Sequence, residues 1–429
     1  MSMRVSRLNK HTNLRGMTLT EMLVATTMTL VIMGVVVQLF GMVGNGVSAS
    51  RASLKMSSEL RAVGHTLRTD LNGTTAETLP PVTLGSDSGY LEIIEGPGND
   101  RSAGVTQLTG DIDDILMFTT QSLGDPFLGK LGSNGDLIES PYAEVIWFCQ
   151  RASTQPLETL TPPSTLYNLH RRQRLVMNYV GAGDFHPGTN SIDESLLRAY
   201  SDLSLRNFGG KLFPNGLSDL TKRENRFLHK PATFPFSISL DADGLADLLG
   251  HVPDSRLPDS RLGEDIVLTN VLAFDVRVYD PMVEIKTANS IALVPGDQGY
   301  INGGSSSVLG AYVDMGTPGA VTFNAMDKKS QLTTQTYDTW SSHYECNGIN
   351  EDEFLEADQG MDWKDNQTID DPKDPKTVAA NGIIDDEAEL ETSPPYPVPL
   401  RGLEVRIRIY DASTRQVRQV TVRHTFVPH

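Results

Sequence analysis

An uncharged run of 29 residues, from Met22 to Ser50, constrains this chain more than any other part of its sequence. Its densest apolar part, Met22 to Val43, would rise about 33 Å as an α-helix, which is enough to cross a hydrocarbon layer of roughly 30 Å. No second run of this kind occurs in the 429 residues. The sequence therefore predicts one membrane-spanning helix near the N-terminus.

Charge is distributed unevenly along the chain, whose formal net charge is −18. Residues 1–16 contain four basic residues and no acidic one, whereas residues 345–391 contain 16 acidic residues and three lysines. A basic segment before the span and an acidic body after it predict a single-pass topology with a cytoplasmic N-terminus and an extracytoplasmic head. The net negative charge argues against nucleic acid as a partner.

The N-terminus has two generic interpretations, a plain signal anchor or a secretory signal cut after Val47-Ser48-Ala49. The apolar run is longer than the run of about 7–15 residues that is usual in a cleaved signal. Glu21 suits neither interpretation, because a carboxylate at the entry of an apolar helix costs on the order of 2–3 kcal/mol if it lies deep in lipid. The acid indicates a more specific role.

The segment Arg15-Gly16-Met17-Thr18-Leu19-Thr20-Glu21, followed by the apolar run, resembles the cleavage and methylation motif of type IV prepilins and type II secretion pseudopilins. The resemblance implies that prepilin peptidase cuts between Gly16 and Met17 and then methylates the new N-terminus at Met17. Met17 stands where the family usually has Phe, and Thr20 stands where an aliphatic residue is commoner. Glu21 would be the fifth residue of the mature chain.

The resemblance also implies why the family keeps an acid there. When these helices pack in a filament, the carboxylate is thought to meet the terminal amine of a neighbouring subunit, so that two costly isolated charges become one pair. The implied partners are prepilin peptidase, other pilins or pseudopilins that contact the N-terminal helix, and inner-membrane lipid. The implied function is that of a minor subunit, assembled into or at the tip of a type IV pilus or type II secretion pseudopilus.

An apolar stripe predicts that the helix continues beyond the span and ends near Leu71. The stripe residues follow one another at spacings of three or four: Met56, Leu60, Val63, Leu67 and Leu71. Asp70 falls on another face of this helix, and Asn72-Gly73 supplies a stop. Four glycines predict local bending or melting in the first half: Gly34, Gly41, Gly44 and Gly46.

The rest of the chain has the pattern of a β-rich head. Four segments rich in β-branched and aromatic residues predict strands: Ile112–Thr120, Ala143–Gln150, Leu166–Val176 and Asp265–Asp280. The clearest hairpin joins the alternating segment 403–410 to a second strand containing Val420, Val422 and Phe426. A long helix before a mostly antiparallel sheet gives the α+β class. The order of strands is similar to that in J-type minor pseudopilins and large minor pilins.

The predicted organisation has five parts: a basic leader at 1–16, a pilin-like helix at 17–71, a β-rich head at 72–344, an acidic insert with a Pro-rich linker at 345–399, and a hairpin at 400–429 that completes the head. Two stretches rich in Gly, Ser and Asn predict long loop insertions in the head: 183–215 and 287–307.

The acidic insert contains the pattern N-G-I-x-[DE]-D-E twice. Calcium prefers six to eight oxygen ligands, and its loops use Asp, Asn and Glu around a Gly. Neither copy is an intact EF-hand loop, because the twelfth loop position would be Phe354 or Ala388. Two interpretations remain, a solvated acidic loop or a degenerate calcium site using these residues: Asn347, Glu351, Asp352, Asn381, Asp385, Asp386 and Glu387.

The sequence contains no G-x-S-x-G, H-E-x-x-H or P-loop motif, and its nine histidines are scattered. It therefore predicts no catalytic residues and no cofactor besides the possible calcium. Cys149 and Cys346 would form one disulfide in an oxidising compartment, or stay apart if Cys149 is buried in its strand. A second functional hypothesis is a membrane-tethered extracytoplasmic protein that binds calcium or another ligand and does not polymerise.

Overall fold

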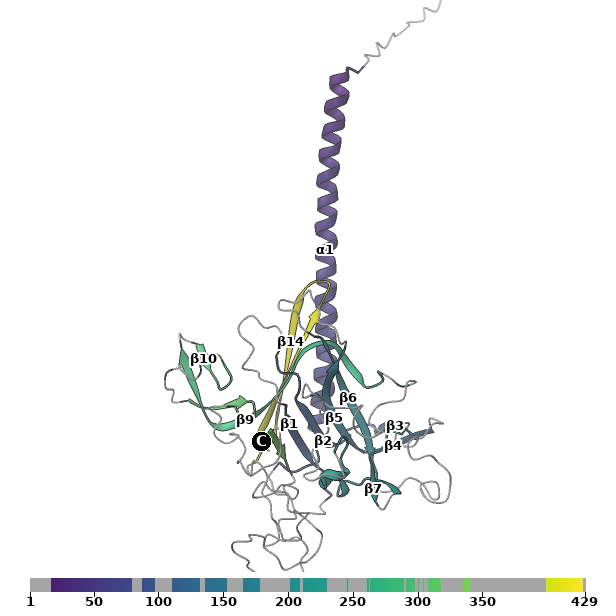
Figure 1. The fold of residues 1–429 in the computed structure, drawn as a ribbon. Coiled ribbons are helices and arrows are strands. Elements are labelled where there is room, and N and C mark those ends of the chain that lie inside the picture. Colours follow the sequence, from purple (N-terminus) through teal and green to yellow (C-terminus); the bar gives the residue numbers. More distant parts are fainter. Residues whose placement is uncertain are drawn as a thin grey trace, which may run out of the picture. The chain divides into compact units, whose positions relative to one another are not determined.

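The computed structural model describes these residues: 17–78, 87–96, 110–131, 136–152, 165–177, 201–208, 211–229, 245, 261, 263–288, 291–297, 300, 304, 308–317, 335–339 and 399–426. The chain divides into two compact units, Met1–Lys55 and Met56–His429. The first unit contains most of helix α1 (Leu19–Asn72), and the second contains the end of that helix and a large β-sheet (Figure 1). The predicted α+β class is confirmed.

Helix α1 begins two residues later and ends one residue later than the 17–71 predicted. It is uninterrupted at Gly34, Gly41, Gly44 and Gly46, so the melting predicted there does not occur. Each glycine costs about 1 kcal/mol relative to Ala, but a helix of 54 residues has many backbone hydrogen bonds on either side of them.

Over the described residues the sheet has ten strands, and the strand pairs found there are all antiparallel. Eight strands follow one path: β12 (Gln335–Asp338), β1 (Leu91–Glu95), β2 (Ile115–Gln121), β5 (Tyr142–Arg151), β6 (Tyr167–Val176), β9 (Ile266–Ala288), β13 (Gly402–Asp411) and β14 (Gln416–Thr425). Strand β9 also pairs with β10 (Ile291–Leu293) and β11 (Val308–Val313). The four predicted strands and the predicted C-terminal hairpin are thus β2, β5, β6, β9 and β13–β14.

Two small hairpins were not predicted. Strands β3 (Phe127–Leu131) and β4 (Asp136–Ser140) form one, and β7 (Leu205–Phe208) and β8 (Lys211–Pro214) form the other. Strands β7 and β8 lie in the stretch 183–215, and β10 lies in 287–307, so the prediction that these stretches are irregular is wrong for those residues. Such short strands are defined by backbone pairing and carry too few residues for a hydrophobic alternation to be recognised.

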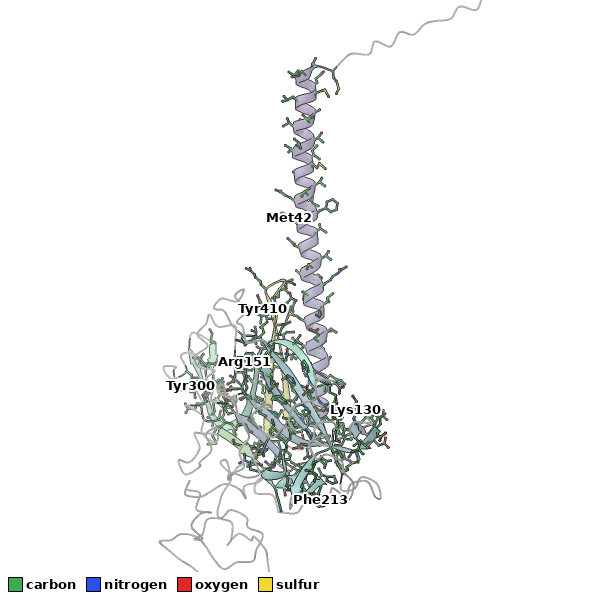
Figure 2. All side chains as sticks on the ribbon, turned by 45° about the vertical axis from the view of Figure 1, so that its right-hand side comes forward. Met42, Lys130, Arg151, Phe213, Tyr300 and Tyr410 are labelled. Atoms are coloured by element: carbon green, nitrogen blue, oxygen red, sulfur yellow. The ribbon has the colours of Figure 1, made fainter. Side chains whose placement is uncertain are left out.

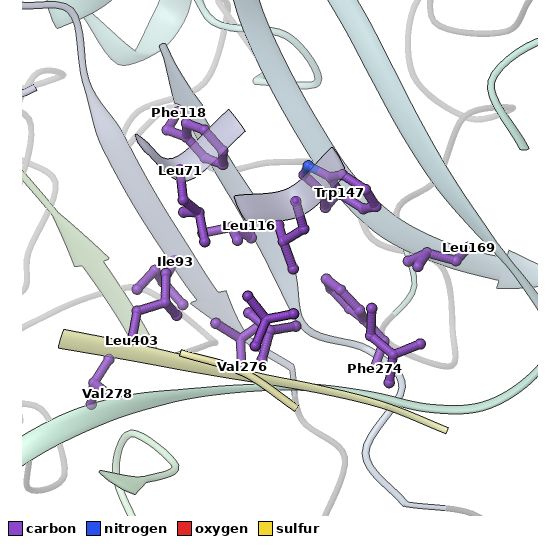
Figure 3. Close-up of a cluster of buried hydrophobic side chains, with 14 of the residues drawn as sticks. Leu71, Ile93, Leu116, Phe118, Trp147, Leu169, Phe274, Val276, Val278 and Leu403 are labelled. Atoms are coloured by element: carbon purple, nitrogen blue, oxygen red, sulfur yellow. The ribbon is translucent and has the colours of Figure 1, made fainter. Parts of the chain in front are cut away.

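Both faces of the central strands are buried. Alternate residues of β2 and β5 belong to two different clusters, so that Phe118 and Trp147 face the stripe of α1 whereas Met117 and Phe148 face the other way. Figure 3 shows Leu71 of the helix beside Phe118 and Leu116 on its side of the sheet. The opposite face is covered by residues of the 211–229 segment, among them Leu220 and Phe227. Burial on both faces explains why β2 and β5 are nearly continuous apolar runs.

The 211–229 segment is also attached to the sheet by buried charges. It contains two short 3-10 helices, η2 (Asp219–Thr221) and η3 (Arg223–Asn225). Glu92 of β1 accepts hydrogen bonds from Arg223 at 2.8 Å and from Arg226 at 2.7 Å. Arg226 also bonds Asp338 of β12 at 2.7 Å. Burial alone would raise the pKa of Glu92, but His229, Arg223 and Arg226 outweigh burial and hold that pKa well below its ordinary value.

Asp70 lies in the last turn of α1, on a different face from the apolar stripe. It is buried, and its carboxylate accepts two hydrogen bonds from Arg171 of β6, both at 2.7 Å. The indole N–H of Trp147 donates a third at 3.1 Å. Periodicity placed Asp70 off the apolar stripe correctly, but the last helical turn is covered on that side too, and an arginine from the sheet satisfies the acid.

We expect Asp70→Asn to destabilise the Met56–His429 unit by about 3 kcal/mol, because the buried carboxylate would be lost and the half-buried Arg171 would keep no countercharge from it. Urea unfolding of the detergent-solubilised chain, followed by tryptophan fluorescence, measures this effect. Arg61→Gln is the matched control, since it removes one charge from an exposed position of the same helix. Equal midpoints for the two variants would contradict the role assigned to Asp70.

Candidate functional site

The first turn of α1 is closed by a reciprocal pair of hydrogen bonds between Thr18 and Glu21. The backbone N–H of Thr18 donates to Glu21 Oε2 at 2.9 Å, and the backbone N–H of Glu21 donates to Thr18 Oγ1 at 3.3 Å. The Thr18 hydroxyl also donates to Glu21 Oε2 at 3.0 Å. This arrangement is a capping box, in which two backbone donors that the helix leaves unpaired are satisfied by side chains.

The capping box gives Glu21 a local role in addition to the one that the prepilin resemblance implies. The signal was present, because T-x-x-E before an apolar run is the pattern of a helix start. The acid in the first turn also opposes the partial positive charge at the helix N-terminus. Glu21 therefore stabilises the start of α1 within a single chain.

Side chains of the first unit are exposed around the helix, as Figure 2 shows near Met42. The large apolar side chains between Met17 and Val47 are all at least 43% exposed. Three threonine hydroxyls donate hydrogen bonds to backbone carbonyls of the helix. Thr26 and Thr27 donate to the carbonyl of Leu23, and Thr29 donates to that of Ala25. Such back-bonding leaves no hydroxyl proton unsatisfied in an apolar solvent. By length and composition α1 is a candidate membrane span or signal sequence.

We expect Thr18→Val to weaken the first turn of α1 by about 1 kcal/mol, since the Glu21 N–H loses its acceptor. In micelles, amide hydrogen exchange of Glu21 and its helical neighbours should become about fivefold faster. Thr18→Ser keeps the hydroxyl and should exchange like the natural chain. Identical exchange in the Val and Ser variants would show that the cap contributes nothing.

Several predicted site residues lie outside the described residues. They are Gly16, Cys346 and the seven residues of the possible calcium site in the insert: Asn347, Glu351, Asp352, Asn381, Asp385, Asp386 and Glu387. Their roles stay predictions. Met17 is described and exposed, and Cys149 is fully buried in β5, so the burial expected for its thiol is confirmed.

A second group of acids was not recognised in the sequence. Glu95 ends β1, and Asp111 and Asp114 precede β2. All three are buried, and each offers a carboxylate oxygen within 4.8 Å of the others. Burial first, then repulsion from neighbouring acids, raises the pKa of Glu95 and of Asp114 well above the ordinary values. Oxygen donors at this spacing are able to hold a metal ion.

Comparison with known proteins gives no family to which this chain is assigned: no protein-family model, no curated protein and no solved structure matches it. The function is therefore argued from the residues of this chain alone.

Proposed function

We propose that this chain is a minor pilin or pseudopilin-like structural subunit, matured by prepilin peptidase and assembled through its N-terminal helix into, or at the tip of, a type IV pilus or type II secretion pseudopilus. The proposal depends on one observation. An acid, Glu21, lies five residues after Gly16 in the first turn of an apolar helix whose side chains are exposed.

An exposed apolar helix surface needs lipid or sister helices to cover it. The apolar side chains of residues 17–47 would be stable in a bilayer, and the same surface would pack against equivalent helices in a filament. The threonine hydroxyls at 26, 27 and 29 are satisfied within the helix, so they oppose neither environment.

The acid favours a filament over a simple anchor. A carboxylate near the apolar core costs on the order of 2–3 kcal/mol. A cut after Gly16 would create a new amine at Met17, and in an assembled subunit pair this amine and Glu21 of a neighbour would neutralise each other. A simple tether would gain nothing from the acid beyond the helix cap.

The β-rich head supports a role in selecting partners. The central strands of its sheet are covered on one face by the end of α1 and on the other by the 211–229 segment, so recognition would use edges and loops. Exposed apolar side chains are present on the β9–β10–β11 region, at Met282, Ile291, Val308 and Leu309. We infer that the head selects neighbouring subunits or caps the filament, and that it does so on the extracytoplasmic side of the inner membrane.

The mature N-terminus tests the proposal. In the native host, mass spectrometry of the purified chain should find an N-methylated Met17 as the first residue, and Gly16→Leu should retain residues 1–16. A natural chain that keeps its leader, or begins at Ser50, would overturn the proposal. The tethered, non-polymerising binding protein would then be the better account for an intact leader.

Assembly is tested separately with Glu21→Ala. We expect this variant to insert in the membrane and fold its head, but to lose co-purification with other pilin-type subunits from detergent extracts. Glu77→Ala is the control, because Glu77 is an exposed acid beyond the end of α1. Co-purification of Glu21→Ala at the level of the control would contradict the intermolecular role.

A further inference from the structure

The acids Glu95, Asp111 and Asp114 lie where three parts of the second unit meet. Strand β6 pairs with β9 as far as Val271, and β11 pairs with β9 from Val278 onward. Between these pairings, Gly110 donates to Leu272, and Phe274 donates to the carbonyl of Asp111. The segment 110–114 thus follows the middle of β9, and Glu95 joins it from the end of β1.

Each carboxylate of the triad is oriented by a backbone N–H. Val276 donates to Asp114 Oδ2 at 2.6 Å, Met315 donates to Glu95 Oε2 at 3.2 Å, and Asp113 donates to Asp111 Oδ1 at 3.3 Å. The donors come from β9, from the turn after β11 and from the segment itself. These bonds fix the carboxylates in place without supplying a positive charge.

Asp114 carries an observation that is independent of the clustering. Its side chain is 1% exposed, and its buried Oδ1 has no hydrogen-bond partner in the part of the chain that the structure describes. An unpaired buried oxygen costs roughly 1–3 kcal/mol, and more when the group is charged. Because Oδ2 already accepts the N–H of Val276, Oδ1 is the oxygen left for a further ligand.

Two arginines, one of β9 and one of β13, form ion pairs with acids outside the triad. Arg277 contacts Asp275 at 3.1 Å and Asp314 at 2.9 Å. Arg406 approaches Asp275 only to 3.9 Å and bonds Glu404 at 2.7 Å. Among the described residues, no ion pair joins a basic side chain to Glu95 or Asp114.

The oxygen atoms of the triad indicate which metal ions it would bind. The triad offers oxygen atoms only, which suits hard divalent cations and disfavours zinc, whose sites prefer nitrogen and sulfur. Two oxygens on opposite sides of a calcium ion are about 4.6–5.2 Å apart, given Ca–O distances of 2.3–2.6 Å. The three oxygens, within 4.8 Å of one another, therefore fit around one calcium ion.

We propose that Glu95, Asp111 and Asp114 bind one divalent cation, calcium in preference to magnesium, which fastens the two ends of the connection between β1 and β2 to the middle of β9. Calcium accepts irregular coordination completed by water, whereas magnesium demands a near-ideal octahedron at about 2.0–2.1 Å. This site uses no residue of the acidic insert at 345–391 and is independent of the proposed filament function.

The test uses the full chain in detergent, stripped of metal with EDTA and dialysed. Titration with CaCl2 in a calorimeter should give saturable binding in the natural chain, and saturating calcium should raise the Tm by several degrees. MgCl2 at the same concentration should have a smaller effect. If calcium gives neither a saturable heat nor a Tm shift, the proposal is wrong. The buried acids would then be stabilised by protonation of their carboxyl groups.

Two variants assign the site. Asp114→Asn keeps the shape of the side chain, so we expect it to be at least as stable as the natural chain in EDTA, because repulsion is relieved, and to lose the calcium-induced Tm shift. The double variant Asp385→Ala and Asp386→Ala should keep that shift. A shift that persists in Asp114→Asn, or that vanishes in the double variant, would place calcium elsewhere. The difference in Tm between Asp114→Asn and the natural chain should be larger in calcium than in EDTA. An equal decrease in both conditions would show that Asp114 stabilises the fold without binding the ion.

Discussion

The carboxylate of Asp70, held by both donors of Arg171 and by the indole of Trp147, determines how the end of α1 meets the sheet. Apolar packing along Met56–Leu71 is non-directional and would tolerate small shifts of the helix along its axis. A bidentate arginine pair does not tolerate them, because both hydrogen bonds require one orientation of two planar groups. The ion pair therefore fixes the position of the helix along the sheet, at the cost of desolvating two charges. The free energy of the contact itself comes mainly from apolar burial.

The buried acids of the sheet are stabilised in two different ways. On one side, Glu92 and Asp338 are matched by Arg223 and Arg226, and Arg226 also lies 4.1 Å above the ring of Tyr90. That network is balanced by residues of the 211–229 segment, and it fixes the segment to β1 and β12. Near the other end of β1, the hydrogen bonds that Glu95 and Asp114 accept from described residues come from backbone N–H groups. This contrast between Glu92 and the pair Glu95 and Asp114 is the reason to propose a bound cation beside Glu95 and Asp114.

The sequence contained enough information for the class of fold but too little for its polar contacts. The helical periodicity from Met56 to Leu71 and the predicted segments that became β2, β5, β6 and β9 each extend over eight or more residues, and the structure confirms them. The triad of Glu95, Asp111 and Asp114 has no such signal, because its members become neighbours only when β1 and β9 are in place. The contacts of Asp70 could not be predicted for the same reason, since its partners come from β5 and β6. The hairpins β3–β4 and β7–β8 were missed because their strands are only four or five residues long.

Glu21 has a local role in the helix cap, and in the proposed filament the same carboxylate would also contact a neighbouring subunit. Both hydrogen bonds from Thr18 end on Oε2. Within the described residues, Oε1 receives no hydrogen bond, so a cation at that oxygen would not have to break the cap. The cap also holds the side chain at the N-terminal end of the helix, where a neighbouring terminal amine would approach it. A carboxylate oriented beforehand loses less rotamer entropy on pairing than a free one, by about 0.5–1.5 kcal/mol for a flexible side chain. The capping box therefore lowers the cost of the acid in the unassembled subunit and at the same time prepares it for the proposed contact.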